Sequence, residues 1–222
     1  MTTTLEDAIK LHELVKEKKI LFCLTHNYTG YPMVRQARQM IIDGLLGNIH
    51  IVNVEYPQGF MASLDPKTAK EKVGWRGIEN DQNAGMSSVL FDHATHTFHM
   101  AQYVSSLKVE EVSADVTKNI KSIGVDDNVH AMLKFDNGAT GLLWSSFVAT
   151  GNEHGLRVRI FGSQGSIDWL QDIPNQLNFF PVDGPIQKFT RASKWVSDFS
   201  KENSRIGAGH PEGYFDAFAN LY

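Results

Sequence analysis

Residues 128–148 read NVHAMLKFDNGATGLLWSSFV, and this stretch decides the fold. Apolar and polar residues alternate from Asn128 to Phe135, which is typical of a strand with one buried face. Asp136-Asn137-Gly138 is a strong hairpin signal, and a second strand-like run follows at Ala139–Val148. The stretch therefore predicts two antiparallel strands joined by a tight turn.

The flanking sequence extends this pattern. Val109–Asn119 alternates in the same way, and Leu156–Phe161 and Ser166–Leu170 enclose the turn Gly162-Ser163-Gln164-Gly165. A phosphate-binding loop is the alternative for GSQGS, but the Lys-Ser/Thr ending and a following helix are absent, so a tight turn is favoured. Short strands joined by tight turns predict an antiparallel sheet.

Two helical patterns, at residues 32–44 and 87–103, must cover one face of this sheet. The predicted fold class is α+β, an open, mostly antiparallel sheet with helices on one face. The other face should be partly apolar, as Leu142, Trp144 and Phe147 indicate. Such a face is often buried against a copy of itself, which predicts a homodimer or a higher homo-oligomer.

The first residues predict a separate αβ unit. Thr3 and Glu6 form a capping box at the start of an amphipathic helix, and a short strand should run from Ile20 to about Thr25. Cys23 lies in the apolar run of this strand and is predicted to be a buried, inert thiol. The helix and strand need a sheet to pack on.

Composition excludes several classes of function. Of the 222 residues 42% are hydrophobic and 21% charged, and the net charge is −4, without a basic stripe that would follow a phosphate backbone. Nucleic acid is therefore an unexpected partner. A single cysteine fits a reducing compartment, and no apolar leader or membrane-length segment is present, so we expect a cytoplasmic protein with a small-molecule substrate.

Asp92 and His96 are the strongest candidates for chemistry. Four residues apart on a predicted helix, they lie on one face about one turn apart, so the carboxylate can orient the imidazole and stabilise its charge. This arrangement suits a general acid/base, although the same pair can also be a purely structural hydrogen bond. In the irregular stretch before this helix, Trp75 and Arg76 are predicted to contact the ligand, as a ring and a planar guanidinium suited to sugar or phosphate.

A metal centre is the rival interpretation of this helix. Asp92, His93, His96 and His99 are ligand types, but His93 points about 100° away from the Asp92–His96 face, and the sequence contains no HExxH motif. We therefore predict no metal, and we interpret His99 as packed or facing solvent.

His26, Asn27 and Tyr28 are further candidates. They follow the predicted strand at 20–25, at its carboxyl end, where open α/β sheets bind their ligands. A polar loop with no contact to substrate is the alternative.

The order of five sequence blocks resembles the Gfo/Idh/MocA group of NAD(P)-dependent oxidoreductases of sugars and cyclitols. The blocks are GWR at residues 74–76, the stretch from Ala84-Gly85 to Asp92 and His96, DDNVHAMLKFDNGATGLLWSS, RVRIFGSQGSIDW and GHPEGYFDAFANLY. The resemblance runs from about residue 4 to the last residue. It implies that residues 1–28 are the last helix and strand of a dinucleotide-binding domain, and that residues 29–222 form a substrate-binding and dimerisation domain.

The resemblance also implies roles for the candidate residues. His96 and Asp92 would be catalytic, His26, Asn27 and Tyr28 would bind the substrate, and Trp75 and Arg76 would contact substrate or cofactor, which would be NAD or NADP. The Gly-rich nucleotide turn and the Glu-Lys-Pro segment of the group are absent from the sequence. We therefore expect a fragment, truncated at both ends and inactive alone. The alternative is a non-catalytic module that binds sugars or assembles as a dimer.

Overall fold

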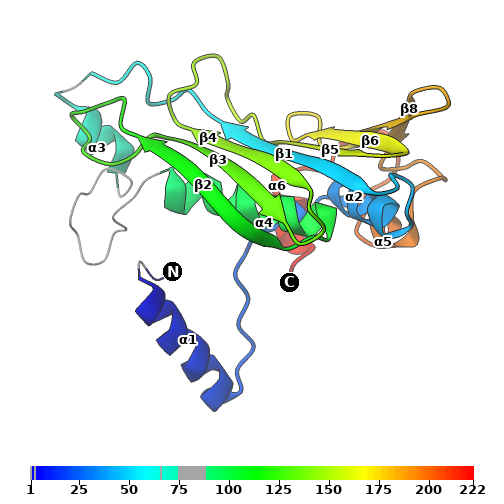
Figure 1. The fold of residues 1–222 in the computed structure, drawn as a ribbon, viewed down its shortest axis with the longest axis horizontal. Helices are drawn as coiled ribbons and strands as arrows, with labels where there is room; N and C mark the ends of the chain where they lie inside the picture. The colour runs from blue at the N-terminus through cyan, green and yellow to red at the C-terminus, as the bar shows by residue number, and fades with distance from the viewer. Residues whose placement is uncertain (1, 3, 66, 75–88) are drawn as a thin grey trace.

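A computed structural model describes residues 2, 4–65, 67–74 and 89–222 of the chain. These residues form one curved sheet of eight strands in the order β2-β3-β4-β1-β5-β6-β7-β8 (Figure 1). The strands are β1 (Ile49–Pro57), β2 (Val109–Thr117), β3 (Asn128–Phe135), β4 (Thr140–Ser146), β5 (Arg157–Gly162), β6 (Gly165–Leu170), β7 (Gln176–Pro181) and β8 (Gln187–Thr190).

The sheet is mixed but mostly antiparallel, which confirms the predicted fold class. Within the described residues every neighbouring pair of strands is antiparallel except β1 and β4. Both predicted hairpins, β3–β4 and β5–β6, are present. Because β4 is parallel to β1 and β5 is antiparallel to it, the carboxyl ends of β1 and β4 and the amino end of β5 meet at one edge of the sheet.

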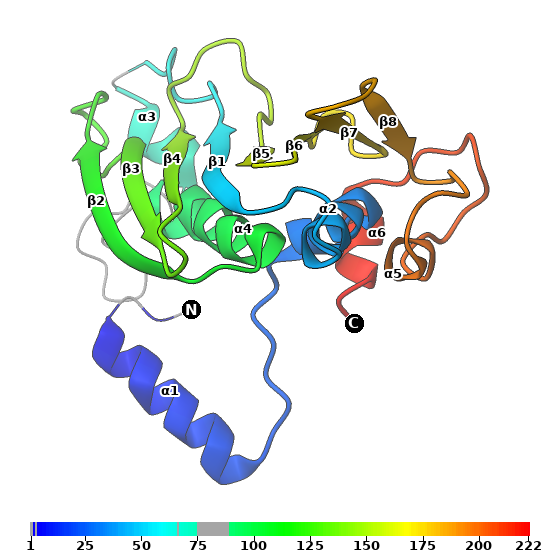
Figure 2. The ribbon, with the colours of Figure 1, turned by 45° about the vertical axis from the view of Figure 1, so that its right-hand side comes forward.

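Two helices lie under the sheet (Figure 2). Helix α4 (Thr95–Ser105) contacts β1, and α2 (Pro32–Ile42) contacts α4 and the strands β6 and β7. Apolar residues of the helices and of the inward positions of the strands form the core, among them Met33, Val34, Ala37, Met40, Met100, Val104, Val52, Val54, Leu143, Val158 and Ile160. We call the helix side of the sheet the covered face and the other side the open face.

The smaller helices border this core. They are α3 (Ala69–Val73), the π-helix η3 (Leu90–Ala94), α5 (Asp198–Lys201), α6 (Tyr214–Ala219) and the short 3-10 helix η1 (Asn27–Gly30). The stretch before Val89, predicted to be irregular, thus contains α3. Among the helices of the described ranges, none is long and apolar enough to cross a bilayer.

Helix α1 (Leu5–Lys18) stands away from the sheet in both views (Figures 1 and 2). Its N-cap is Thr4, whose hydroxyl accepts a hydrogen bond from the Asp7 amide at 3.2 Å, one residue later than the predicted cap. The predicted strand at 20–25 is wrong, because these residues have no neighbouring strand to pair with in the described part of the chain. For the same reason Cys23 is exposed rather than buried.

Phe147 corrects a prediction for the open face. Leu142 lies on that face with 56% of its surface exposed, and Trp144 is half-buried there. Phe147 follows the end of β4 and is fully buried, with its ring against His93 and Phe60. Leu142 and Trp144 are two residues apart and share a face, whereas Phe147 is three residues after Trp144 and lies beyond the strand, which ends at Ser146, so it does not continue their alternation.

Candidate functional site

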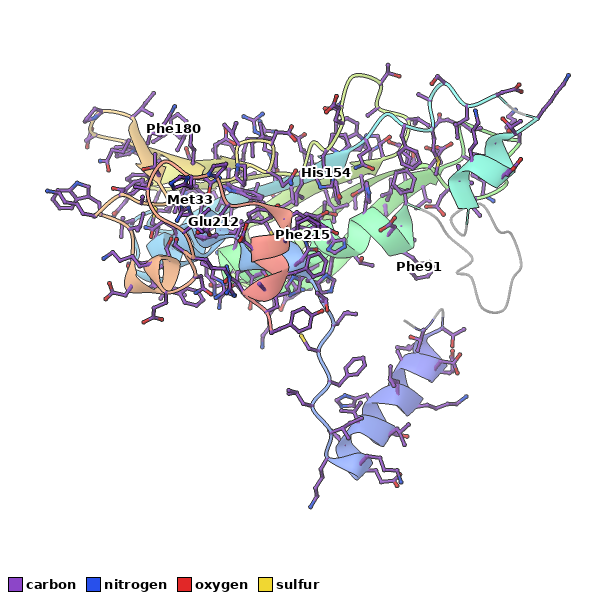
Figure 3. The ribbon with its side chains drawn as sticks, turned by 180° about the vertical axis from the view of Figure 1, so that it is seen from behind. Met33, Phe91, His154, Phe180, Glu212 and Phe215 are labelled. Atoms are coloured by element: carbon purple, nitrogen blue, oxygen red, sulfur yellow. The ribbon has the colours of Figure 1, made fainter. Side chains whose placement is uncertain are left out.

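Six aromatic side chains gather at the edge of the sheet where β1 and β4 end and β5 begins. We call them the histidine–tyrosine cluster: His26, Tyr28, Tyr56, His96, His99 and His154. Tyr56 lies near the end of β1, and His96 and His99 lie on α4. His154, which is labelled in Figure 3, precedes β5. The topology of the sheet therefore assembles the site from segments more than 100 residues apart.

Close packing against α6 holds the segment that carries Tyr28. A Cβ atom on Gly30 would lie 2.0 Å from the Ala217 carbonyl oxygen, so only glycine allows α6 to approach η1 this closely. The Asn220 amide donates to the Gly30 carbonyl at 2.9 Å. Tyr214 of α6 places its ring 6.3 Å from that of Tyr28. The last helix thus fixes one wall of the cluster.

A buried hydrogen-bond network joins both tyrosines to His154. The Tyr28 and Tyr56 hydroxyls are 2.6 Å apart, and His154 Nε2 lies 3.0 and 2.9 Å from them. Gln58 Nε2 is 2.8 Å from His154 Nδ1. An amide NH₂ can only donate, so Nδ1 is the acceptor and Nε2 carries the proton in the neutral ring. Burial raises the pKa of both phenols above the ordinary value, so both hydroxyls stay protonated.

His93 has a structural role. Its ring stacks on Tyr56 at 3.6 Å between centroids, and its Nδ1 is 3.3 Å from the Tyr56 carbonyl oxygen. The ring is buried, and Phe147 packs against its edge. His93 therefore packs against Tyr56 and helps to hold its ring in place.

His96 and His26 are direct neighbours. Their Nδ1 atoms are 3.4 Å apart, and their rings meet edge to face. His26 also stacks on His99, with centroids 4.2 Å apart and planes within 12°. His99 thus belongs to the cluster through His26, as a packed residue.

Burial keeps these imidazoles neutral at neutral pH. It lowers the pKa of His96 to about 4, with the neighbouring His26 acting in the same direction and the Asp92 charge opposing it. Burial likewise lowers the pKa of His99 to about 4 and lowers the pKa of His26 and of His154. His96 can therefore accept a proton at neutral pH, and Asp92 is the group that favours the resulting charge.

Asp92 lies in a π-turn rather than in a regular α-helix. The Ala94 amide donates to the Val89 carbonyl five residues back, and the Thr95 hydroxyl donates to the Asp92 carbonyl at 2.8 Å. The Asp126 carboxylate accepts from the Leu90 amide at 2.9 Å and so anchors the start of this turn. Single π-turns within helices are frequent at functional sites, because they displace one side chain from the helical register.

The structure brings four of the predicted site residues close together, namely His26, Tyr28, Asp92 and His96. Asn27 is buried beside them, and its Nδ2 has no hydrogen-bond partner among the described residues. Trp75 and Arg76 lie outside the described residues. Within those residues no group of three or more His, Cys, Asp and Glu side chains is arranged to hold a metal ion.

Sequence patterns did not identify two residues of the cluster, Tyr56 and His154. Each is a single polar aromatic residue at the end of an apolar strand, which by itself is weak information. The missing information was the order of the strands, because β5 returns beside β1 and brings His154 to Tyr56. A predicted pairing of β1 with β5 would have identified both.

A groove of about 500 Å³ opens next to the cluster, between α4 and the edge strand β2. His26 and His99 line its wall, together with the apolar side chains of Leu24, Phe91 and Phe98. Phe91 projects away from the sheet at this end of the molecule (Figure 3). The groove connects the His26 ring to the surface.

Comparison with known proteins identifies the family. Residues 34–168 match the model of the GFO/IDH/MocA C-terminal domain. The chain belongs to this family. It is 33% identical over 215 residues to an uncharacterized oxidoreductase, YfiI, of Bacillus subtilis, a match that covers 96% of the chain and 54% of that protein. The chain spans about half the length of the curated relatives it matches.

Solved structures of the family superpose on the whole chain. An oxidoreductase from Sinorhizobium meliloti is 40% identical, with a TM-score of 0.85 over 100% of the chain and 57% of that protein. An inositol dehydrogenase homolog from Azotobacter vinelandii, in complex with NADH and myo-inositol, is 33% identical, with a TM-score of 0.86 over 99% of the chain and 55% of that protein.

Proposed function

We propose that the chain is the substrate-binding and proton-transfer half of an NAD(P)-dependent oxidoreductase that acts on a hydroxyl group of a sugar or cyclitol. The observation that carries this proposal is His96, a half-buried imidazole kept neutral by burial and placed between the Asp92 charge and the His26 ring. The Azotobacter vinelandii relative, in complex with NADH and myo-inositol, supports the substrate class. The nucleotide-binding half would be supplied from outside residues 1–222.

The residues present fit the chemistry of a nicotinamide cofactor. When an alcohol is oxidised, a base must take the hydroxyl proton while the carbon loses hydride, and the bound nicotinamide would accept that hydride. A neutral, partly desolvated imidazole beside a carboxylate is such a base. Trp75 and Arg76 are the residues of this chain that we expect to contact the cofactor.

His96 takes the hydroxyl proton in this proposal, and Asp92 stabilises the imidazolium. His26, Asn27 and Tyr28 surround the substrate. The Tyr28 hydroxyl is held by Tyr56, and the unpartnered Nδ2 of Asn27 is a free donor for a substrate oxygen. Positioned acid/base groups typically contribute about 10²–10⁴ in rate.

Binding of myo-inositol and NAD⁺ to the purified chain tests this proposal. We expect myo-inositol to shift the imidazole NMR signals of His96, and NAD⁺ added with it to be left unreduced by the chain alone. Loss of the His96 response in the His96→Asn variant, with the cluster otherwise folded, would assign the response to this site. Reduction of NAD⁺ by the 222-residue chain would contradict the division into two halves.

We further propose that the open face mediates self-association. Ile51, Met132 and Leu142 lie there with 42%, 62% and 56% of their surfaces exposed. Met132 and Leu142 border a shallow depression of about 460 Å³ together with Trp144 and His130. Ile51 borders a neighbouring depression of about 550 Å³. We expect Leu142→Asp to convert an oligomer to monomers in analytical ultracentrifugation, and an unchanged sedimentation coefficient would contradict the assignment.

A non-catalytic module that binds sugars or assembles as a dimer is the second candidate function. The depression on the open face favours it, because His130 stacks on Trp144 there with parallel rings, and flat aromatic surfaces suit sugar rings. In that case myo-inositol would shift the signals of Trp144 and His130 and leave His96 unchanged.

A further inference from the structure

The contact between His26 and His96 can hold only one proton between the two Nδ1 atoms. Those atoms are 3.4 Å apart, so one nitrogen must donate and the other must accept. The protonation of each Nε2 atom then follows. If His96 carries the shared proton, its own Nε2 is bare; if His26 carries it, His96 is protonated at Nε2.

We propose that His26 is a positioning residue that shares one proton with His96 and thereby sets whether His96 accepts a proton from the substrate or donates one to it. The inference rests on the proposed function, because it assigns the Nε2 side of His96 to the substrate. In this inference, His96 protonated at Nδ1 accepts the substrate proton in oxidation, and His96 protonated at Nε2 donates a proton in reduction.

The protons balance in both directions. In oxidation, His96 Nε2 takes the hydroxyl proton as the carbon–hydrogen electron pair leaves as hydride for the nicotinamide. His96 then passes its Nδ1 proton to His26 Nδ1, and His26 releases its Nε2 proton to water. In reduction, water protonates His26 Nε2, the shared proton moves back, and His96 gives its Nε2 proton to the carbonyl oxygen while hydride returns to the carbon.

The surroundings of the pair favour a single proton over two. His99 stacks on His26, and His154 is near enough to His96 to disfavour its charge, so a second positive charge in the cluster is costly. Asp92 opposes this effect at His96. Tyr28 and Tyr56 keep their protons, because burial raises the pKa of each phenol. The imidazole nitrogens are therefore the groups of the cluster between which a proton can move.

The groove next to the cluster provides the exit. His26 and His99 line it, and it opens between α4 and β2. The groove is open to solvent, so a proton leaving His26 on this side can pass to water. If His26 only bound the substrate, it would not need a connection to solvent through this groove.

Long-range ¹H–¹⁵N NMR of the purified chain tests the inference through the tautomers. We expect His26 and His96 at neutral pH to hold complementary tautomers, one protonated at Nδ1 and the other at Nε2. The same tautomer for both rings, with both Nδ1 atoms bare, would overturn the inference. This measurement needs neither nucleotide nor substrate, so its outcome is independent of the proposed function.

Two variants separate the shared proton from simple packing. His26→Phe keeps a flat ring against His99 and removes the nitrogen, and we expect the pKa of His96 to rise, because the neighbouring imidazole lowers it. His26→Gln restores a hydrogen-bond partner for His96 Nδ1 without an ionisable ring, and we expect the pKa of His96 to rise in this variant as well. The matched control His210→Gln replaces an exposed histidine outside the cluster and should leave the pKa of His96 unchanged. An identical His96 titration in all three variants would refute the role of His26.

Steady-state kinetics give the second readout, measured on a protein that contains both this chain and a nucleotide-binding half and that oxidises a polyol. We expect His26→Phe to reduce kcat roughly 10²-fold, the low end of the contribution of a proton-transfer group, with a smaller change in KM. A change confined to KM would show that His26 only binds substrate, which would overturn the inference while the proposed function stands. If His96→Asn loses activity and His26→Phe keeps it, the inference is likewise overturned and the proposed function stands.

Discussion

The two faces of the sheet are built from alternate residues of the same strands, yet they carry different chemistry. On β1, Val54 and Tyr56 are buried on the covered face, whereas Asn53 and Glu55 are half-buried on the open face. On β4, the neighbours Leu143 and Leu142 divide in the same way. The period of two along a strand thus separates the core and the candidate active site from a surface that remains available to a partner.

Polar groups are also treated differently on the two faces. On the covered face, the hydroxyls of Tyr28 and Tyr56 and the His154 ring satisfy one another in a network of hydrogen bonds. On the open face, charges pair across strands, as Arg157 does with Asp168. The first arrangement fixes geometry, and the second keeps the face hydrated. Substitutions one residue apart should therefore affect chemistry or association separately.

The largest effect is expected from removal of the proposed base. His96→Asn in a form that turns over polyol should reduce kcat by about 10²–10⁴-fold, because no imidazole remains to take the hydroxyl proton. The matched variant on the open face, His130→Asn, should leave turnover unchanged. Steady-state kinetics of both variants check this, and equal losses would remove the distinction between the faces.

Two adjacent leucines give the next effect. Leu143→Ala leaves a cavity in the core, where Leu143 is 4% exposed, and should lower the free energy of unfolding by about 2–5 kcal/mol. Leu142→Ala, at an exposed position, should change it by less than about 0.5 kcal/mol. Urea denaturation at a protein concentration low enough to prevent association measures both. Similar losses at both positions would show that the open face is part of the core.

Tyr56→Phe should destabilise the cluster to a smaller extent. The change removes a buried hydroxyl that bonds to Tyr28 and His154 and leaves their polar groups short of a partner. The cost should be about 1–3 kcal/mol. Tyr222→Phe is the control, because its ring is 88% exposed. If both variants unfold at the same urea concentration as the wild-type chain, the network contributes nothing to stability.

A fourth effect is a pH dependence of stability. His96 and His99 have a pKa of about 4 in the folded chain, below the ordinary value of 6.5. Between these values the unfolded chain binds more protons than the folded chain, so the free energy of unfolding should fall as pH decreases from about 6.5 to about 4. Denaturation at a series of pH values, repeated with His99→Phe, should show a shallower decrease in the variant. The same slope in both would exclude His99 as a contributor.

Local patterns in the sequence predicted the sheet and its helices well. Alternation and the Asp136-Asn137-Gly138 turn fixed β3 and β4, and Pro32 correctly marked the start of α2. These signals are local, because hydrogen bonding and side-chain direction within one element determine them. The strand predicted at 20–25 was wrong because strand formation is not local: an apolar run forms a strand only beside another strand.

The candidate site was only partly predictable. Asp92 and His96 were identified because they lie four residues apart on one helix. Tyr56 and His154 lie 98 residues apart in sequence and meet only through the pairing of β1 with β5. The π-turn at η3 was also unpredicted, since its first residue, Leu90, is held by a hydrogen bond from its amide to the Asp126 carboxylate, 36 residues away in sequence.

Titration of the chain with myo-inositol, followed by NMR at every histidine, tests the central claim most directly. The claim is that the covered face binds the substrate at His96 and that the open face does not. We predict shifts at His96 and His26 and none at His130. Shifts at His130 with none at His96, or no response at His96 up to the solubility limit of the polyol, would contradict it.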